Sequence, residues 1–366
     1  IAGLFSFYNA GSGTNQSNHM YKLGPVHQGI LERGSKTGSF SYLLWPCRIG
    51  AFTAVIGKHY ANFDTTEFPF SYIADEEGKS VLTPAMNLLT VGTRRDSEKW
   101  SSRDRRKDSV KLDLIIFDLL NPYTVGKIMK GVKVLQELYS TASKDQEFVT
   151  YKGINIRRLL LRTSSKYYEM ALKIYFGKTI VERIAQVLEL KSMAELKRKL
   201  KSGNEKVTGD WIDVCGLIAP NFLIEEVLSK VDNGKIQILN SLQDELKSIF
   251  TSYNANSWTW CLNAVETKLN LKLNDWTKET FVQLIDDWKQ NTIKLNNIIA
   301  KDAQKEFDAI AKIGFGIDGD NETKQKDFEA VRGTFEKNKF VNQLNNESKA
   351  IEQKASELVS LVRSLT

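Results

Sequence analysis

The sequence of 366 residues is poor in histidine, cysteine and proline, with three, three and six of these residues. Cys47, Cys215 and Cys261 are odd in number and far apart. This pattern argues against a disulfide framework and predicts a reducing compartment, the cytoplasm. It gives no support for a structural zinc site. No apolar run approaches about 18 residues without a charge, so we expect no contact with a membrane.

The excess of positive charge is also small, because the 51 lysines and arginines exceed the 44 acidic residues by only seven and give a net charge of +7. This balance, without a helix-turn-helix or RNP-type motif, argues against a nucleic-acid partner. The opening residues IAGLFSFYNAG include neither a methionine nor the basic and apolar regions of a signal peptide. We therefore expect the chain to be the C-terminal part of a longer protein.

A six-residue period marks the first part of the chain. Aliphatic or β-branched residues recur at Leu31, Thr37, Leu43, Ile49 and Val55, and small residues follow four places later at Ser35, Ser41, Cys47 and Thr53. In a left-handed parallel β-helix, the large side chain of each hexad fills the interior and the small one fits at a corner. The period therefore predicts the end of such a β-helix, and the alternative is an ordinary sheet that matches by chance.

Helical spacing replaces this period after the first part. We predict an α+β fold with three regions: β-helix coils and a loop excursion at 1–74, a basic connecting segment at 75–110, and an α-helical domain at 111–366. Asn121 and Pro122 are placed to begin one helix, and Gly177 is expected to separate two others. Residues 277–314 predict one long helix. Four tryptophans are expected in the helical core: Trp258, Trp260, Trp276 and Trp288.

The tail has leucine or isoleucine at seven-residue spacing, at Leu344, Ile351, Leu358 and Leu365. This spacing is typical of a coiled-coil seam or of the packed face of a long helical hairpin. Because Ser348 interrupts the seam, the hairpin is favoured.

All three histidines, His19, His27 and His59, lie within the first sixty residues. Imidazole is the natural general base at neutral pH, so each is a candidate catalytic residue. His59 stands where the six-residue period requires a small residue. We expect its ring to point outward or to end the repeat, and in either case to be available for catalysis. The alternative for each is a hydrogen-bonded structural role.

A basic run, GTRRDSEKWSSRDRRK, spans residues 92–107. Guanidinium groups bind phosphate with two hydrogen bonds, and an indole can stack on a base. The run could therefore bind a nucleotide, a phosphorylated sugar or the phosphates of coenzyme A. The candidate phosphate-binding residues are Arg94, Arg95, Lys99, Arg103, Arg105 and Arg106, with Trp100 as the stacking residue. The alternative is a salt-bridged surface connection, because Asp96, Glu98 and Asp104 dilute the charge.

The strings GSGTNQSNHMYKLGPVHQG, PCRIGAFTAVIGKHYANFDTTEFPFSYI, GTRRDSEKWSSRDRR and LNPYTVGKIMKG resemble an uncharacterised bacterial family with hexapeptide-repeat β-helices before a helical tail. The match is good over about the first 135 residues. The wider hexapeptide superfamily contains acyltransferases, and sugar nucleotidyltransferases with an appended β-helix. The resemblance implies trimers, with a histidine among His19, His27 and His59 as the base that deprotonates the acceptor.

Two functions follow as expectations. The first is a transferase that moves an acyl group to a sugar or sugar-nucleotide acceptor, with the arginine cluster anchoring a phosphorylated donor. The second is a role without acyl transfer, as a non-catalytic oligomeric scaffold, a ligand-binding protein or the appended module of a sugar nucleotidyltransferase.

Overall fold

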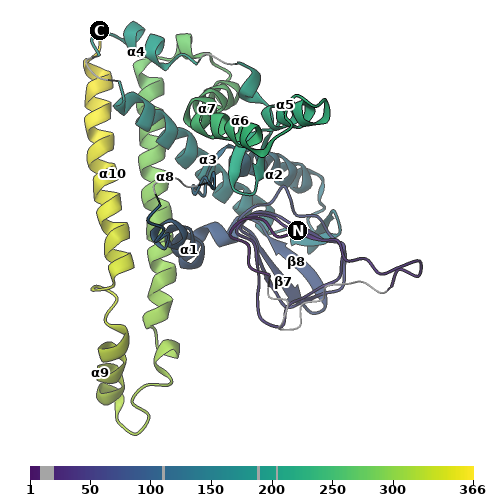
Figure 1. Cartoon of the computed structure of the whole chain (residues 1–366). Helices are drawn as coiled ribbons and strands as arrows, with labels where there is room; N and C mark the ends of the chain where they lie inside the picture. Colours follow the sequence, from purple (N-terminus) through teal and green to yellow (C-terminus); the bar gives the residue numbers. More distant parts are fainter. Residues whose placement is uncertain (9–19, 109–111, 188–189, 203–204) are drawn as a thin grey trace.

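The computed structural model describes residues 1–8, 20–108, 112–187, 190–202 and 205–366. Short strands form one part of the molecule and long helices the rest (Figure 1), which confirms the α+β class. Among the described residues, no helix is both long enough and apolar enough to cross a bilayer.

The first strands pair in parallel, β1 with β4, β2 with β5 and β3 with β6. Leu43, Ile49 and Val55 are fully buried, so the six-residue period correctly predicted which side chains face inward. The small residues also lie inside, and Ser35 Oγ donates to the Gly50 carbonyl over 2.7 Å. These strands are β1 (Ile30–Leu31), β2 (Lys36–Thr37), β3 (Tyr42–Leu43), β4 (Arg48–Ile49), β5 (Ala54–Ile56) and β6 (Lys58–His59).

The predicted left-handed β-helix is nevertheless wrong. Each of these strands has only two or three residues, and β5 belongs to a mixed six-stranded sheet with the order β2-β5-β7-β8-β10-β9. β7 (Tyr72–Glu76) and β8 (Lys79–Thr83) are antiparallel, and so are β9 (Phe148–Tyr151) and β10 (Ile154–Arg157). Because β7 turns back into β8 as a hairpin after pairing with β5, the stack of short parallel strands ends there, and the next parallel pair, β8 with β10, joins strands that are far apart in sequence.

The helical part begins within the segment expected to be a connection. The helices are α1 (Val91–Ser102), α2 (Pro122–Thr141), α3 (Leu160–Ala185), α4 (Met193–Leu200), α5 (Asn221–Asp232), α6 (Leu239–Thr251), α7 (Tyr253–Leu269), α8 (Lys278–Gln304), α9 (Asn321–Arg332) and α10 (Lys339–Ser364). Short 3-10 turns are η2 (Met86–Leu89), η3 (Glu205–Thr208), η4 (Leu273–Asp275), η5 (Lys305–Phe307) and η6 (Ile310–Lys312), and β11 (Trp211–Val214) pairs with β12 (Leu217–Pro220).

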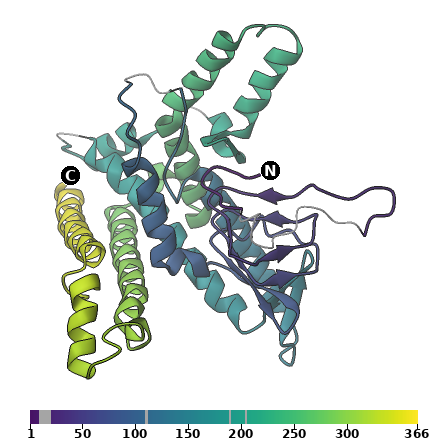
Figure 2. The same ribbon diagram turned by 60° about the horizontal axis from the view of Figure 1, so that its bottom comes forward.

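The helices agree with the sequence-based predictions in part. Asn121 caps α2 by accepting from the Thr124 amide, and Pro122 is the first helical residue, as predicted. The predicted break at Gly177 is wrong, since α3 runs through it. The long helix forms as α8 but ends at Gln304. α10 lies beside α8 as a hairpin (Figures 1 and 2), as favoured. The four tryptophans are buried, as expected.

A buried ion pair joins the strand part to the β11–β12 hairpin. The guanidinium of Arg33 is fully buried, and its Nε lies 3.6 Å from Asp213 Oδ2 without a hydrogen bond. Its Nη2 donates to the Ile116 carbonyl over 2.6 Å. Burial lowers the pKa of Arg33 and raises that of Asp213, each shift being opposed by the partner's charge. Each charge therefore offsets part of the cost of burying the other, and removal of either side chain would leave a buried charge unpaired.

Candidate functional site

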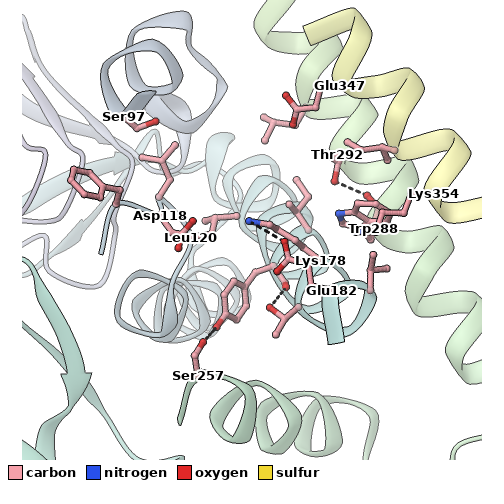
Figure 3. Close-up of a pocket in the computed structure, with 18 of the residues that line it drawn as sticks. Ser97, Asp118, Leu120, Lys178, Glu182, Ser257, Trp288, Thr292, Glu347 and Lys354 are labelled. Atoms are coloured by element: carbon pink, nitrogen blue, oxygen red, sulfur yellow. Dashed lines mark hydrogen bonds and ion pairs between the residues drawn. The ribbon is translucent and has the colours of Figure 1, made fainter. Parts of the chain in front are cut away.

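A groove of about 940 Å³ runs between helices α1, α3, α8 and α10 (Figure 3). The segment before α2 and the first two turns of α7 close its other sides. Helices that are far apart in sequence supply the residues that line it. They include Arg94, Ser97, Glu98, Ser101, Phe117, Asp118, Tyr175, Lys178, Thr179, Glu182, Arg183, Ser257, Trp258, Trp288, Thr292, Leu295, Asn296, Ile299, Glu347, Ala350 and Lys354.

One face of α8 forms the apolar floor of the groove. Trp288, Thr292, Leu295 and Ile299 follow each other at intervals of three or four residues, so they share one side of the helix. All four are buried. Two of the four are long aliphatic side chains and one is an indole, which gives the floor the apolar character usual in sites for organic ligands.

Gly177 of α3 sets how closely α3 approaches this floor. A Cβ atom at this position would lie 2.4 Å from the Trp288 Cβ and 2.8 Å from the Leu284 carbonyl oxygen. Only glycine fits between the two helices at this distance. The residue therefore fixes the α3–α8 contact, and with it the inner wall of the groove.

The hydroxyl groups that line the helical walls donate to carbonyls of their own helices. Thr292 Oγ1 donates to the Trp288 carbonyl over 2.7 Å, and Thr179 Oγ1 to the Tyr175 carbonyl over 2.8 Å. On α1, Ser97 Oγ donates to the Arg94 carbonyl over 2.8 Å. Such bonds are usual for hydroxyls within helices, and they use the one proton of each group. The lone pairs of the Thr292 and Ser97 oxygens remain available as acceptors, whereas the Thr179 hydroxyl also forms a hydrogen bond with the Cys261 thiol.

Asn296 is the buried polar side chain of the floor. It is 1% exposed, and its Nδ2 donates to Ser348 Oγ over 3.2 Å. Its Oδ1 is buried and has no hydrogen-bond partner among the described residues. A buried acceptor without a partner costs free energy, so this oxygen is the feature of the floor that most needs a ligand or a water molecule.

Charged side chains form the rim of the groove. Arg94 donates to Glu98 and to Glu347, each over 2.7 Å. On the α3 side, Lys178 lies 3.7 Å from Glu182. Among the described side chains, neither Asp118 nor Lys354 makes an ion pair, and Figure 3 shows them on opposite sides of the groove. The charges therefore balance over the whole rim, whereas the group of Arg94, Glu98 and Glu347 has more negative than positive charge.

A hydroxyl pair closes the end of the groove at α7. Tyr175 Oη lies 3.1 Å from Ser257 Oγ, and both side chains are buried. Burial raises the pKa of Tyr175 well above its ordinary value, with a smaller contribution from Cys261. The phenol is therefore neutral at physiological pH and acts only as a hydrogen-bonding group.

Two of the predicted histidines, His27 and His59, do not line this groove. His19 lies outside the described residues, and His27 is exposed. The expectation that the His59 ring is available, whether by pointing outward or by ending the repeat, is wrong, because the side chain is fully buried. Its Nδ1 lies 3.0 Å from Ser80 Oγ and its Nε2 lies 3.2 Å from the Ile56 carbonyl. Burial lowers its pKa, opposed by that carbonyl and by Asp75. These contacts are those of a structural histidine.

The predicted phosphate-binding residues lie on α1 and just beyond it. Arg94, Arg95, Lys99 and Trp100 belong to α1, Arg103 caps it, and Arg105 and Arg106 follow. Of this set only Arg94 lines the groove. Lys99 pairs with Asp96, and Arg106 with Asp104 and Asp113. These contacts fit the salt-bridged alternative, and phosphate binding stays a prediction.

Trp100 is half exposed, and its ring lies 5.0 Å from that of Phe5. Phe5 also stacks on Phe117, at 5.6 Å between ring centroids. The indole predicted to stack on a base therefore packs from α1 against Phe5, in an aromatic row that ends with Phe117 at the groove wall.

Sequence reasoning missed the groove because its residues come from four separate helices. One signal was present: Ser348 interrupts the apolar seam of α10, and in the structure it is the partner of Asn296. Among the described residues, no group of three or more histidine, cysteine or acidic side chains could hold a metal ion.

Comparisons with known proteins identify only regions without an assigned role. Residues 1–139 match the family described as "Domain of unknown function (DUF4954)", and residues 192–362 match "Domain of unknown function (DUF6819)". The chain is similar to an uncharacterized protein of Treponema pallidum (strain Nichols), with 22% identity over 256 residues. This match covers 62% of the chain but 34% of that protein, so the chain spans about a third of its relative's length.

No solved structure matches the chain. None of these matches is a hexapeptide-repeat family, and the sheets are short and mixed. The resemblance to that family is therefore wrong, and the groove is built from both matched regions and from α3 between them.

Proposed function

We propose that this chain binds a small organic molecule in the groove between α1, α3, α8 and α10. The observation that carries the proposal is a groove of about 940 Å³ with an indole and aliphatic floor and a few buried polar groups. Ligand sites usually have this size and this mixture, and they often lie where separate units of a chain meet. Here the walls come from both matched regions and from α3.

A screen of small molecules by thermal unfolding tests this proposal. Ala350 is an exposed residue of α10 that lines the groove, and Gln353 is an exposed neighbour that does not. Ala350→Trp should fill part of the groove and abolish the stabilisation that ligands give the unmodified chain. Gln353→Trp should leave it unchanged. Equal loss in both variants, or no stabilising compound in a broad screen, would remove the proposal.

Acyl transfer stays a second proposal, because the exposed ring of His27 is open to a substrate for which it could act as the base. Neither ring nitrogen of His59 is similarly open, since both have partners within the fold. If the reaction occurs, His27→Ala should abolish turnover and leave the unfolding temperature unchanged. Unchanged turnover in His27→Ala and in His19→Ala would end this proposal. Binding of coenzyme A or a nucleotide, and self-association as a trimer, likewise stay predictions.

A further inference from the structure

The chemistry of the groove points to one class of ligand, and this inference rests on the proposed function. The hydroxyls of Thr292 and Ser97 have each used their proton within a helix. Ser101 does the same by donating to the Glu98 carbonyl over 3.3 Å. The walls therefore present oxygen lone pairs, which bind a ligand that supplies hydrogen-bond donors.

The free acceptor of Asn296 can be assigned from its neighbours. Ser348 Oγ donates its proton to the Leu344 carbonyl over 3.0 Å, so toward Asn296 it can only accept. The amide group that faces Ser348 at 3.2 Å must then be the Nδ2 donor. This leaves Oδ1 as the buried atom without a partner, next to Thr292 one turn earlier on α8.

The charges at this end of the groove favour a cation. Glu98 and Glu347 share one guanidinium, that of Arg94, so the three side chains together have an excess of negative charge. Glu347 directly precedes Ser348 on α10 and so lies close to Asn296. On the far side, Lys178 pairs with Glu182 and Arg183 lies over the ring of Trp258. Lys354, two turns from Glu347, lines the end near Trp288.

We infer that the groove binds an organic amine. Its ammonium group donates to Asn296 Oδ1 and Thr292 Oγ1 beside Glu347, and its apolar part packs against Trp288 and Leu295. An ammonium group has three donors and no acceptor, which complements a wall of lone pairs. Hydrogen bonds that involve a charged group are also stronger than neutral ones.

Tryptamine and tryptophol are a matched pair of probes, because they differ only in an ammonium or a hydroxyl at the end of the same indole-ethyl group. Isothermal titration calorimetry at neutral pH should show that tryptamine binds the full chain roughly ten-fold or more tightly than tryptophol. Equal affinities would overturn the inference, because a site that merely accepts an indole would not distinguish the probes. The absence of tryptamine binding would overturn it too.

Asn296→Asp replaces the amide with a carboxylate of the same shape. It should raise the affinity for tryptamine roughly ten-fold and leave that for tryptophol unchanged. Asn297→Asp is the control, since this exposed neighbour adds the same charge but faces the opposite side of α8. An equal gain in both variants would show a long-range charge effect and overturn the inference.

Thr292→Val provides a second test if Asn296→Asp does not fold. It removes one acceptor with little change in shape, and it should weaken tryptamine several-fold. Unchanged affinity would count against the inference. If tryptamine fails but Ala350→Trp still abolishes stabilisation by other compounds, the groove is a binding site for another class. If no compound stabilises the chain, the proposed function fails as well.

Discussion

Arg94 Nη2 donates to Glu347 Oε2 over 2.7 Å, and this ion pair joins α1 to α10 across 253 residues of sequence. Both side chains are partly exposed, at 25% and 30%. Such a pair contributes little to stability, about 1 kcal/mol or less. Its role is positional, because it holds the rim of the groove at the end where Asn296 has an unpartnered acceptor.

Replacing Arg94 with methionine tests the electrostatic part of the account. The substitution leaves Glu98 and Glu347 without their shared cation, so we expect the affinity for tryptamine to rise a few-fold and that for tryptophol to stay unchanged. The gain should shrink with added salt. Arg95→Met is the control, since this exposed neighbour does not line the groove. A weaker affinity in Arg94→Met would contradict the predicted direction.

Gly177→Ala should destabilise the chain, although alanine favours helices. The new Cβ would overlap the Trp288 Cβ and the Leu284 carbonyl oxygen, and overpacking of this kind costs about 1–3 kcal/mol. Gly126 of α2 is a matched control, because an added Cβ would be 3.6 Å from Trp260, an ordinary contact. Gly126→Ala should be neutral or stabilising by up to about 1 kcal/mol. Urea unfolding of both variants measures the difference, and equal effects would remove the close-approach explanation.

The buried pair of Arg33 and Asp213 predicts strong coupling. Arg33→Met leaves a buried carboxylate unpaired and Asp213→Leu leaves a buried guanidinium unpaired, so each should lower the free energy of unfolding by about 3–5 kcal/mol. The double variant should cost clearly less than the two single costs combined. Additive effects in a double-mutant cycle would show that the two charges do not interact.

His59 predicts a loss of stability in mild acid. Burial lowers the pKa of the folded ring, whereas the unfolded chain binds a proton near the ordinary value of about 6.5. Stability from the neutral ring is therefore present above that value and is lost as pH falls toward the folded pKa, by at most about 1.4 kcal/mol per pH unit. Urea unfolding between pH 7.5 and 5.5 measures this slope, which should be smaller in His59→Gln. The same slope in both proteins would contradict the assignment.

The sequence predicted what depends on local pattern. Leu43, Ile49 and Val55 are buried because a six-residue period fixes which side chains face inward, whatever the strands pair with. Asn121 and Pro122 begin α2 because capping depends on neighbouring residues. The same period could not show whether the strands form a regular β-helix, because the β7–β8 hairpin that ends the stack of short parallel strands lies beyond the repeats.

Other features depend on partners far away in sequence. His59 is buried because Ser80 on β8 accepts or donates at its Nδ1, which no local period reveals. Glycine often marks the end of a helix, and Gly177 was expected to do so. In the structure it lies inside α3, because Trp288 of α8 leaves no space for a side chain. Asn296 could not be identified from the sequence for the same reason, since its hydrogen-bond partner, Ser348, belongs to α10.

Hydrogen–deuterium exchange with and without tryptamine tests the central claim, that the groove between α1, α3, α8 and α10 binds an amine. We predict slower exchange in residues 178–186, 288–299 and 347–354, and unchanged exchange in the strands at 30–59. Protection confined to the strand region, or no protection at a concentration where calorimetry shows binding, would contradict it.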